Sequence, residues 1–177
     1  MKVKQMATDS MLAAMCAVLG AISIDLGNIK VTLESIPIII GAMLFGPYDG
    51  AIIGFVGTFV YQVLRYGFSV TTLLWMLPYV VCGIIVGAYT KRRGFSLSTK
   101  KTVFIVIIAE LVVTTLNTGV MYIDSVIYGY YSAVYIFGAL ILRYVICVVK
   151  AAATGVLLPP LLNTLQTRVF FGKEARQ

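Results

Sequence analysis

Long apolar segments recur along the whole chain of 177 residues, separated by short polar stretches. A helix that crosses a bilayer needs about 20 apolar residues, because about 30 Å of hydrocarbon is traversed at about 1.5 Å per residue. Four segments are long enough to span, namely 7–24, 72–89, 102–123 and 133–158. Since 60% of the residues are hydrophobic and only 12% are charged, a water-soluble fold could not bury so much apolar surface. We therefore predict an all-α integral membrane protein.

Two shorter apolar segments, 35–45 and 50–64, flank the turn sequence Gly46-Pro47-Tyr48-Asp49. Proline and glycine together favour a turn over helix continuation, so the two segments are predicted to form a tight helical hairpin. The segment 35–45 is short for a span, which indicates burial against neighbouring helices or a tilted, partial crossing. The hairpin and the four long segments together give six transmembrane helices in a single membrane-embedded domain, residues 1–177.

The distribution of lysine and arginine predicts the orientation in the membrane. Basic residues concentrate in the N-terminal stretch, the loop between the fourth and fifth helices, and the C-terminal stretch: Lys2, Lys4, Lys91, Arg92, Arg93, Lys100, Lys101, Arg168, Lys173 and Arg176. The loops on the opposite side contain only Lys30 and Arg65. Because cytoplasmic loops are enriched in Lys and Arg, we expect both termini in the cytoplasm. The net charge of +7 then reflects topology and lipid headgroups, and no nucleic-acid partner is expected.

Small residues recur at four-residue spacing on several of the predicted helices. In the first helix, Ala13 and Ala17 form such a pair near the cytoplasmic end, where it could serve either internal packing or the docking of a partner subunit. We predict docking for these two alanines and keep internal packing as the alternative. For the other pairs we predict packing within the bundle: Gly50 with Gly54, Gly83 with Gly87, and Ala151 with Gly155.

Three ionisable residues fall at membrane depth, namely Glu110, Arg143 and Lys150. A charge in hydrocarbon costs several kcal/mol unless it is paired or lines a cavity. Counted at about 1.5 Å per residue from the helix ends, Glu110 and Lys150 lie at similar depth, so we predict an ion pair between them. Arg143 lies nearer to Asn117 and has no carboxylate at its own level, which makes it the better candidate for binding a ligand.

Aromatic residues crowd the outer half of the predicted bundle. Most of them suit the membrane interface, where Tyr and Trp are enriched, but some are expected to face a cavity and stack on a flat heterocycle. The predicted lining of that cavity is Trp75, Tyr79, Asn117, Tyr122, Arg143 and Tyr144, with the loops around Asn28 and Tyr66 as its lid. Further polar contacts could come from the loop residues Asp25, Lys30, Glu34 and Arg65.

The chain lacks the residue patterns of catalysis. It contains no histidine, and it has no metal-ligand cluster, no phosphate-binding glycine loop and no paired nucleophile and base. The three cysteines lie inside apolar segments and are expected to be buried, reduced thiols. We therefore predict neither an enzyme nor a metal site, and energy for active transport would have to come from an ion gradient or from a partner.

Two stretches of the sequence carry a resemblance to a known family. The first is Val31-Thr32-Leu33-Glu34-Ser35-Ile36-Pro37-Ile38-Ile39-Ile40-Gly41, followed by Leu44-Phe45-Gly46-Pro47 and Gly50-Ala51, and the second is Thr71-Thr72-Leu73-Leu74-Trp75 with Leu77-Pro78 and Gly83. With these stretches the chain resembles the substrate-binding S components of energy-coupling factor (ECF) transporters, most closely the folate branch. The size, the six helices and the Ala13-x-x-x-Ala17 element fit the same family.

The resemblance implies a function for the chain in the plasma membrane of a bacterium. It would be the vitamin-binding subunit of an ECF-type ABC importer, capturing folate from outside and toppling within the bilayer. Its partners would be a transmembrane T component (EcfT), docked on Ala13 and Ala17, and two ATPase subunits (EcfA) that hydrolyse ATP, so that this chain needs no cofactor of its own. The pocket would lie near the outer surface between the last three helices.

Several alternatives to folate uptake stay open from the residues alone. The vitamin could instead be pantothenate, thiamine or a queuosine precursor. The chain could also be a stand-alone secondary carrier, although we find no convincing inverted repeat or pair of broken helices. A membrane enzyme is the poorest fit, because no acid pair or nucleophile can be assembled.

Overall fold

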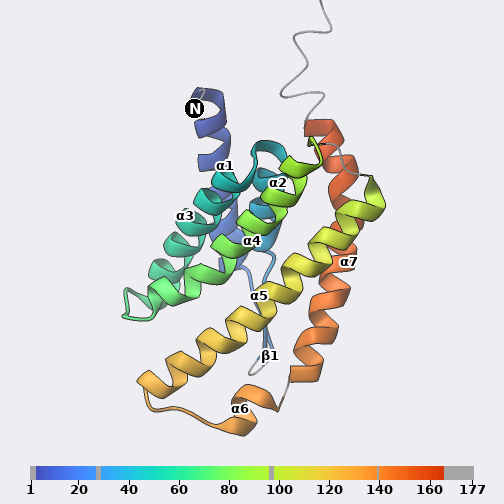
Figure 1. Ribbon diagram of the computed structural model, residues 1–177. Coiled ribbons are helices and arrows are strands. Elements are labelled where there is room, and N and C mark those ends of the chain that lie inside the picture. Colours follow the sequence, from blue (N-terminus) through green and yellow to red (C-terminus); the bar gives the residue numbers. More distant parts are fainter. Residues whose placement is uncertain (1–2, 27–28, 96–97, 139, 166–177) are drawn as a thin grey trace, which may run out of the picture.

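The computed structural model describes residues 3–26, 29–95, 98–138 and 140–165, and these residues form a helical bundle with one short β-hairpin (Figure 1). In chain order the elements are α1 (Val3–Ala21), β1 (Ile24–Leu26), β2 (Ile29–Val31), α2 (Ser35–Phe45), α3 (Pro47–Tyr66), α4 (Thr72–Arg92), α5 (Thr99–Ile127), α6 (Ala133–Phe137) and α7 (Leu140–Leu165). The two strands pair antiparallel, with Ile24 opposite Val31.

Helices α4, α5 and α7 are each long and apolar enough to cross a membrane. A membrane-embedded helical protein is thus confirmed, whereas six spans remain a prediction. Helices α1 and α3 carry ionisable side chains within their length, such as Asp9 and Asp49, which lowers their mean hydropathy. The short helix α2 is apolar but has only 11 residues.

The prediction of one continuous helix over 133–158 is wrong, because two helices, α6 and α7, occupy this segment. The amide of Gly138 donates to the carbonyl of Val134 and closes α6. A Cβ atom at position 138 would lie 2.4 Å from that same carbonyl oxygen. Only glycine fits this tight turn, and the chain then starts α7 in a new direction (Figure 1).

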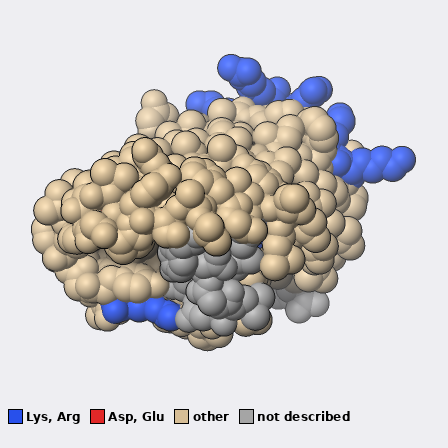
Figure 2. Space-filling view, turned by 90° about the horizontal axis from the view of Figure 1, so that it is seen from below, with Lys and Arg blue, Asp and Glu red and all other residues tan. Residues whose placement is uncertain are grey.

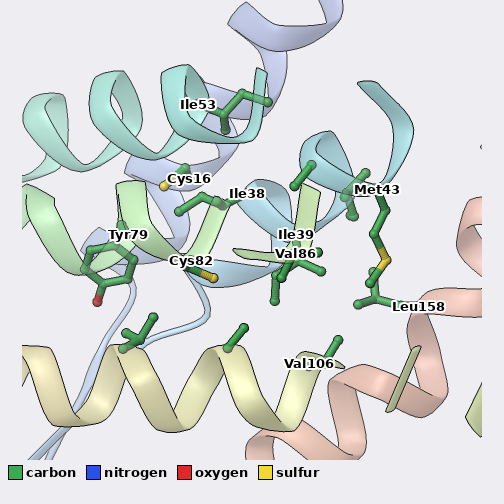
Figure 3. Packing of buried hydrophobic residues seen from close by; sticks show 14 of the residues in the cluster. Cys16, Ile38, Ile39, Met43, Ile53, Tyr79, Cys82, Val86, Val106 and Leu158 are labelled. Carbon is green, nitrogen blue, oxygen red and sulfur yellow. The ribbon is translucent and has the colours of Figure 1, made fainter. Parts of the chain in front are cut away.

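Helix α2 lies at the centre of the bundle and contacts α1, α3, α4 and α7. Its residues Ile38, Ile39 and Ala42 are completely buried, and Figure 3 shows Ile38, Ile39 and Met43 surrounded by side chains of the neighbouring helices. A helix that is apolar on every side is stable only when it is enclosed. The prediction that this short segment is buried against its neighbours is therefore confirmed.

Small residues bring the helices into close contact, as their spacing predicted. A Cβ atom at Gly83 of α4 would lie 2.3 Å from the backbone carbon of Gly50 in α3. In the same way, a Cβ atom at Gly155 of α7 would lie 2.8 Å from Cα of Val103 in α5. Ala151, one turn before Gly155, is completely buried. Internal packing through these residues is confirmed.

The two ends of the bundle differ in charge. The start of α1, the loop from α4 to α5 and the end of α7 lie together at one end, whereas β1, β2 and α6 lie at the other (Figure 1). The described basic residues Lys4, Lys91, Arg92, Arg93, Lys100 and Lys101 therefore share the first end, which we call the basic end. Seen from the hairpin end, basic side chains reach only the rim and no acidic side chain is visible (Figure 2). This segregation agrees with the predicted orientation, in which the basic end faces the cytoplasm.

Candidate functional site: a polar cavity in the helix bundle

A cavity of about 810 Å³ lies in the half of the bundle nearer the hairpin. Its wall is formed by the last turns of α3, the first turns of α4 and α7, the second half of α5, and the segment that joins β2 to α2. Polar and aromatic side chains from all of these elements face it. This is the half of the bundle that the sequence predicts to face outward and to contain a pocket.

The structure brings several of the predicted site residues together and leaves others apart. The cavity wall includes Tyr66, Trp75, Tyr79, Asn117 and Arg143. The predicted residue Asn28 lies outside the described residues.

Tyr122 and Tyr144 lie on the chain next to residues of the cavity wall but do not belong to it. Successive residues of a helix are about 100° apart around its axis, so Tyr144 points away when Arg143 faces the cavity. The Tyr144 hydroxyl hydrogen-bonds to Thr115 at 2.9 Å. Tyr122 is 44% exposed, and its ring packs edge-to-face on Tyr131, with the centroids 5.6 Å apart.

The predicted ion pair between α5 and α7 is confirmed and forms part of the cavity wall. Nζ of Lys150 lies 2.8 Å from Oε2 of Glu110, whose side chain is only 1% exposed. The hydroxyl of Ser35, the first residue of α2, donates to the other oxygen of Glu110. Nζ of Lys150 also lies 3.3 Å from the carbonyl oxygen of Thr32. The pair thus joins α5 and α7 to the segment that enters α2.

Glu34, which the sequence predicted as a further polar contact from the loop, lines the cavity. It lies directly before α2 and is 2% exposed. The hydroxyls of Thr32 and Tyr79 both donate to its Oε1, the former at 2.8 Å. Figure 3 shows Tyr79 at the edge of the core, its hydroxyl directed away from Ile38. One signal for this position is present in the sequence, since a carboxylate beside an apolar helix cannot face lipid.

A second carboxylate, Asp124 of α5, holds aromatic side chains at the wall of the cavity. The indole N–H of Trp75 donates to Oδ1 of Asp124 at 3.3 Å, and the hydroxyl of Tyr130 donates to Oδ2. Trp75 and Tyr79 are one turn apart on α4 and therefore share a face. Each of these two rings is fixed by a hydrogen bond to a different carboxylate.

Two arginines complete the wall of the cavity. The guanidinium of Arg65 donates to the carbonyl of Ala21 at 3.1 Å and to the hydroxyl of Ser23 at 2.9 Å, which ties the end of α3 to the end of α1. The guanidinium of Arg143 lies 3.2 Å from the sulfur of Met121. Both arginines line the cavity, so a ligand with an anionic group would meet a fixed positive charge there. Within the described residues, no group of three or more His, Cys, Asp or Glu side chains could hold a metal ion.

The two alanines predicted to dock a partner are buried in this structure. Ala13 is 6% exposed and Ala17 is 8% exposed. The carbonyl oxygen of Ala13 would lie 2.9 Å from a Cβ atom added at Gly57, so α1 and α3 are in direct contact here. The small-residue spacing therefore serves packing between α1 and α3. Docking through the same alanines stays a prediction.

Comparison with known proteins finds one family for the chain. The family model described as "ECF transporter, substrate-specific component" matches residues 4–170. No curated protein matches the sequence. The family match covers nearly the whole chain, and therefore the cavity and all the helices that form it.

Proposed function

The chain belongs to the substrate-specific components of ECF transporters, and from this membership we propose that it captures a vitamin, with folate as the first ligand to test. As a member of this family it is a substrate-binding transport subunit and not an enzyme. The cavity between α3, α4, α5 and α7 is the site that we propose for the vitamin.

The combination of aromatic rings and a guanidinium on one cavity wall supports folate. A volume of about 810 Å³ lies within the roughly 300 to 1,000 Å³ of small-molecule sites. Trp75 and Tyr79 would stack on the flat heterocycle. Arg143 would bind a carboxylate of the glutamate tail, because its planar fork suits bidentate contact with a carboxylate.

The partners that we propose are a transmembrane T component and two ATPase subunits. The ATPases would hydrolyse ATP, and this chain would supply the substrate site without a cofactor of its own. Ala13 and Ala17 remain the proposed contact with the T component, although that contact would require α1 to move relative to α3. We further propose that the protein resides in a bacterial plasma membrane with the basic end in the cytoplasm.

Mass spectrometry of small molecules released from the gently purified protein, followed by calorimetric titration, tests the proposal. We expect folate to be released and to bind, and pantothenate and thiamine not to bind. Binding of a different vitamin with no response to folate would reject folate and keep the transport role. Uptake that persists in cells without the ATPase subunits would favour the second candidate, a stand-alone carrier.

A further inference from the structure

Four polar side chains from separate parts of the chain meet at one place on the cavity wall. Thr32 and Glu34 precede α2, Tyr79 belongs to α4, and Asn117 belongs to α5. The hydroxyls of Thr32 and Tyr79 donate to the same oxygen of Glu34. The side chain of Asn117 lines the same cavity. We call these four side chains the acceptor cluster.

The acceptor cluster offers acceptors to a ligand rather than donors. The O–H groups of Thr32 and Tyr79 are already used within it. An ionised carboxylate can accept about four hydrogen bonds. The bonds from Thr32 and Tyr79 both go to Oε1 of Glu34. The side-chain oxygen of Asn117 is buried, and within the described part of the chain it has no hydrogen-bond partner. Buried polar atoms are nearly always paired in native proteins, so this oxygen calls for a donor.

We infer that the acceptor cluster binds the donor edge of a planar nitrogen heterocycle, in which an amino group and a ring N–H stand side by side, as in a 2-aminopyrimidin-4-one ring. This inference rests on the proposed function, because it assigns a substrate class to the same cavity. The two adjacent N–H donors pair with the carboxylate of Glu34 and the amide oxygen of Asn117, while Trp75 and Tyr79 stack on the ring. A metal ion is a poor alternative occupant, since one carboxylate and one amide do not supply its ligands.

The inference separates the candidate vitamins. Pterins, including the ring system of folate, and 7-deazaguanines both have this donor edge. Pantothenate has no heterocycle. The aminopyrimidine of thiamine presents an amino group beside ring nitrogens that accept hydrogen bonds, so it lacks the adjacent ring N–H. The cluster therefore favours a pterin or a 7-deazaguanine over the other two.

Pterin and lumazine, which differ by the exchange of the 2-amino group for an oxygen, are the probes that test the inference. Calorimetry on the purified parent protein should show pterin binding at least about tenfold tighter than lumazine. In Glu34→Gln an amide replaces the carboxylate, and pterin binding should weaken roughly ten- to a hundredfold, the usual effect of losing a charge-assisted hydrogen bond. Lumazine binding should change little, so the discrimination between the two probes disappears.

Two further variants provide an independent test and a control. Asn117→Ala should weaken pterin binding, because it removes the second acceptor of the cluster. Asn163→Ala is the matched control, since Asn163 is exposed near the far end of α7 and does not line the cavity. Thermal unfolding in detergent shows which variants are folded. If Glu34→Gln fails to fold, the inference is tested by the preference of the parent for pterin and by the loss of pterin affinity in Asn117→Ala.

The outcomes distinguish this inference from the folate proposal. Folate binding that is unchanged in folded Glu34→Gln and Asn117→Ala would overturn the inference and leave the folate proposal intact. Binding of 7-deazaguanine but not of folate, weakened by the same substitutions, would support the inference and reject folate. Equal affinity of the parent for pterin and lumazine, or binding of pantothenate alone, would overturn the inference.

Discussion

Replacing Lys150 with methionine removes the positive charge that neutralises a buried carboxylate. Nζ of Lys150 lies 2.8 Å from Oε2 of Glu110, and the Glu110 side chain is 1% exposed. In Lys150→Met, Ser35 can still donate to Glu110 but cannot compensate its charge. Breaking a buried pair in this way typically costs about 3 to 5 kcal/mol, roughly two to four decades in the folding equilibrium at about 1.4 kcal/mol per decade.

The double variant Glu110→Gln/Lys150→Met should be more stable than Lys150→Met, because it leaves no charge uncompensated. Reversible unfolding in mixed detergent and SDS micelles measures the free energy of unfolding. The proteins compared are the parent, Lys150→Met, Glu110→Gln and the double variant. Lys91→Met, at an exposed position of the basic end, is the control and should change the stability by less than about 0.5 kcal/mol. Additive losses in the double-mutant cycle, or a loss below about 1 kcal/mol in Lys150→Met, would refute the argument.

Three further predictions concern the ligand, the packing and the partner. Arg143→Ala should weaken folate binding by about 1.5 to 3 kcal/mol, roughly ten- to a hundredfold. Calorimetry measures this on a variant whose thermal unfolding is unchanged. Full affinity in that variant would remove Arg143 from the site. Gly83→Ala should lower the unfolding temperature, because a Cβ atom there lies 2.3 Å from the α3 backbone, whereas Gly119→Ala, with nothing within 4 Å, should not. Equal unfolding temperatures of Gly83→Ala and Gly119→Ala would contradict the close packing of α3 and α4. Ala13→Trp and Ala17→Trp should abolish uptake in cells; retained stability and ligand binding would support docking of the T component, while lost stability would assign the alanines to packing against α3 alone.

The helical framework could be predicted because each helix leaves a simple trace in the sequence. Apolar length marks the spanning helices, and the turn at Gly46 and Pro47 marks the α2–α3 hairpin. The break at Gly138 could not be predicted, since a single glycine in an apolar segment is compatible with a continuous helix. The β-hairpin was missed because each strand has only three residues, which is too short for an alternating pattern.

The candidate site was predicted less well than the fold, for a physical reason. A residue at membrane depth stands out by its charge, so the pair of Glu110 and Lys150 could be found by depth alone. Which side of a helix faces the cavity depends on the rotation of that helix, and the sequence could not separate Arg143 from the adjacent Tyr144. Glu34 acquires its place only through tertiary contact with Tyr79 of α4.

The central position of α2 constrains how the protein can be assembled during synthesis. A translocon releases segments sideways into lipid according to their hydrophobicity and length, and 11 residues cover only about 16 Å at 1.5 Å per residue. The shielding of α2 comes from α1, α3, α4 and α7, and two of these helices are synthesised well after it. Ribosome-bound chains that end before α4 should therefore hold α2 in a protease-sensitive or chaperone-bound state, and biogenesis should be complete only when the last helix has emerged.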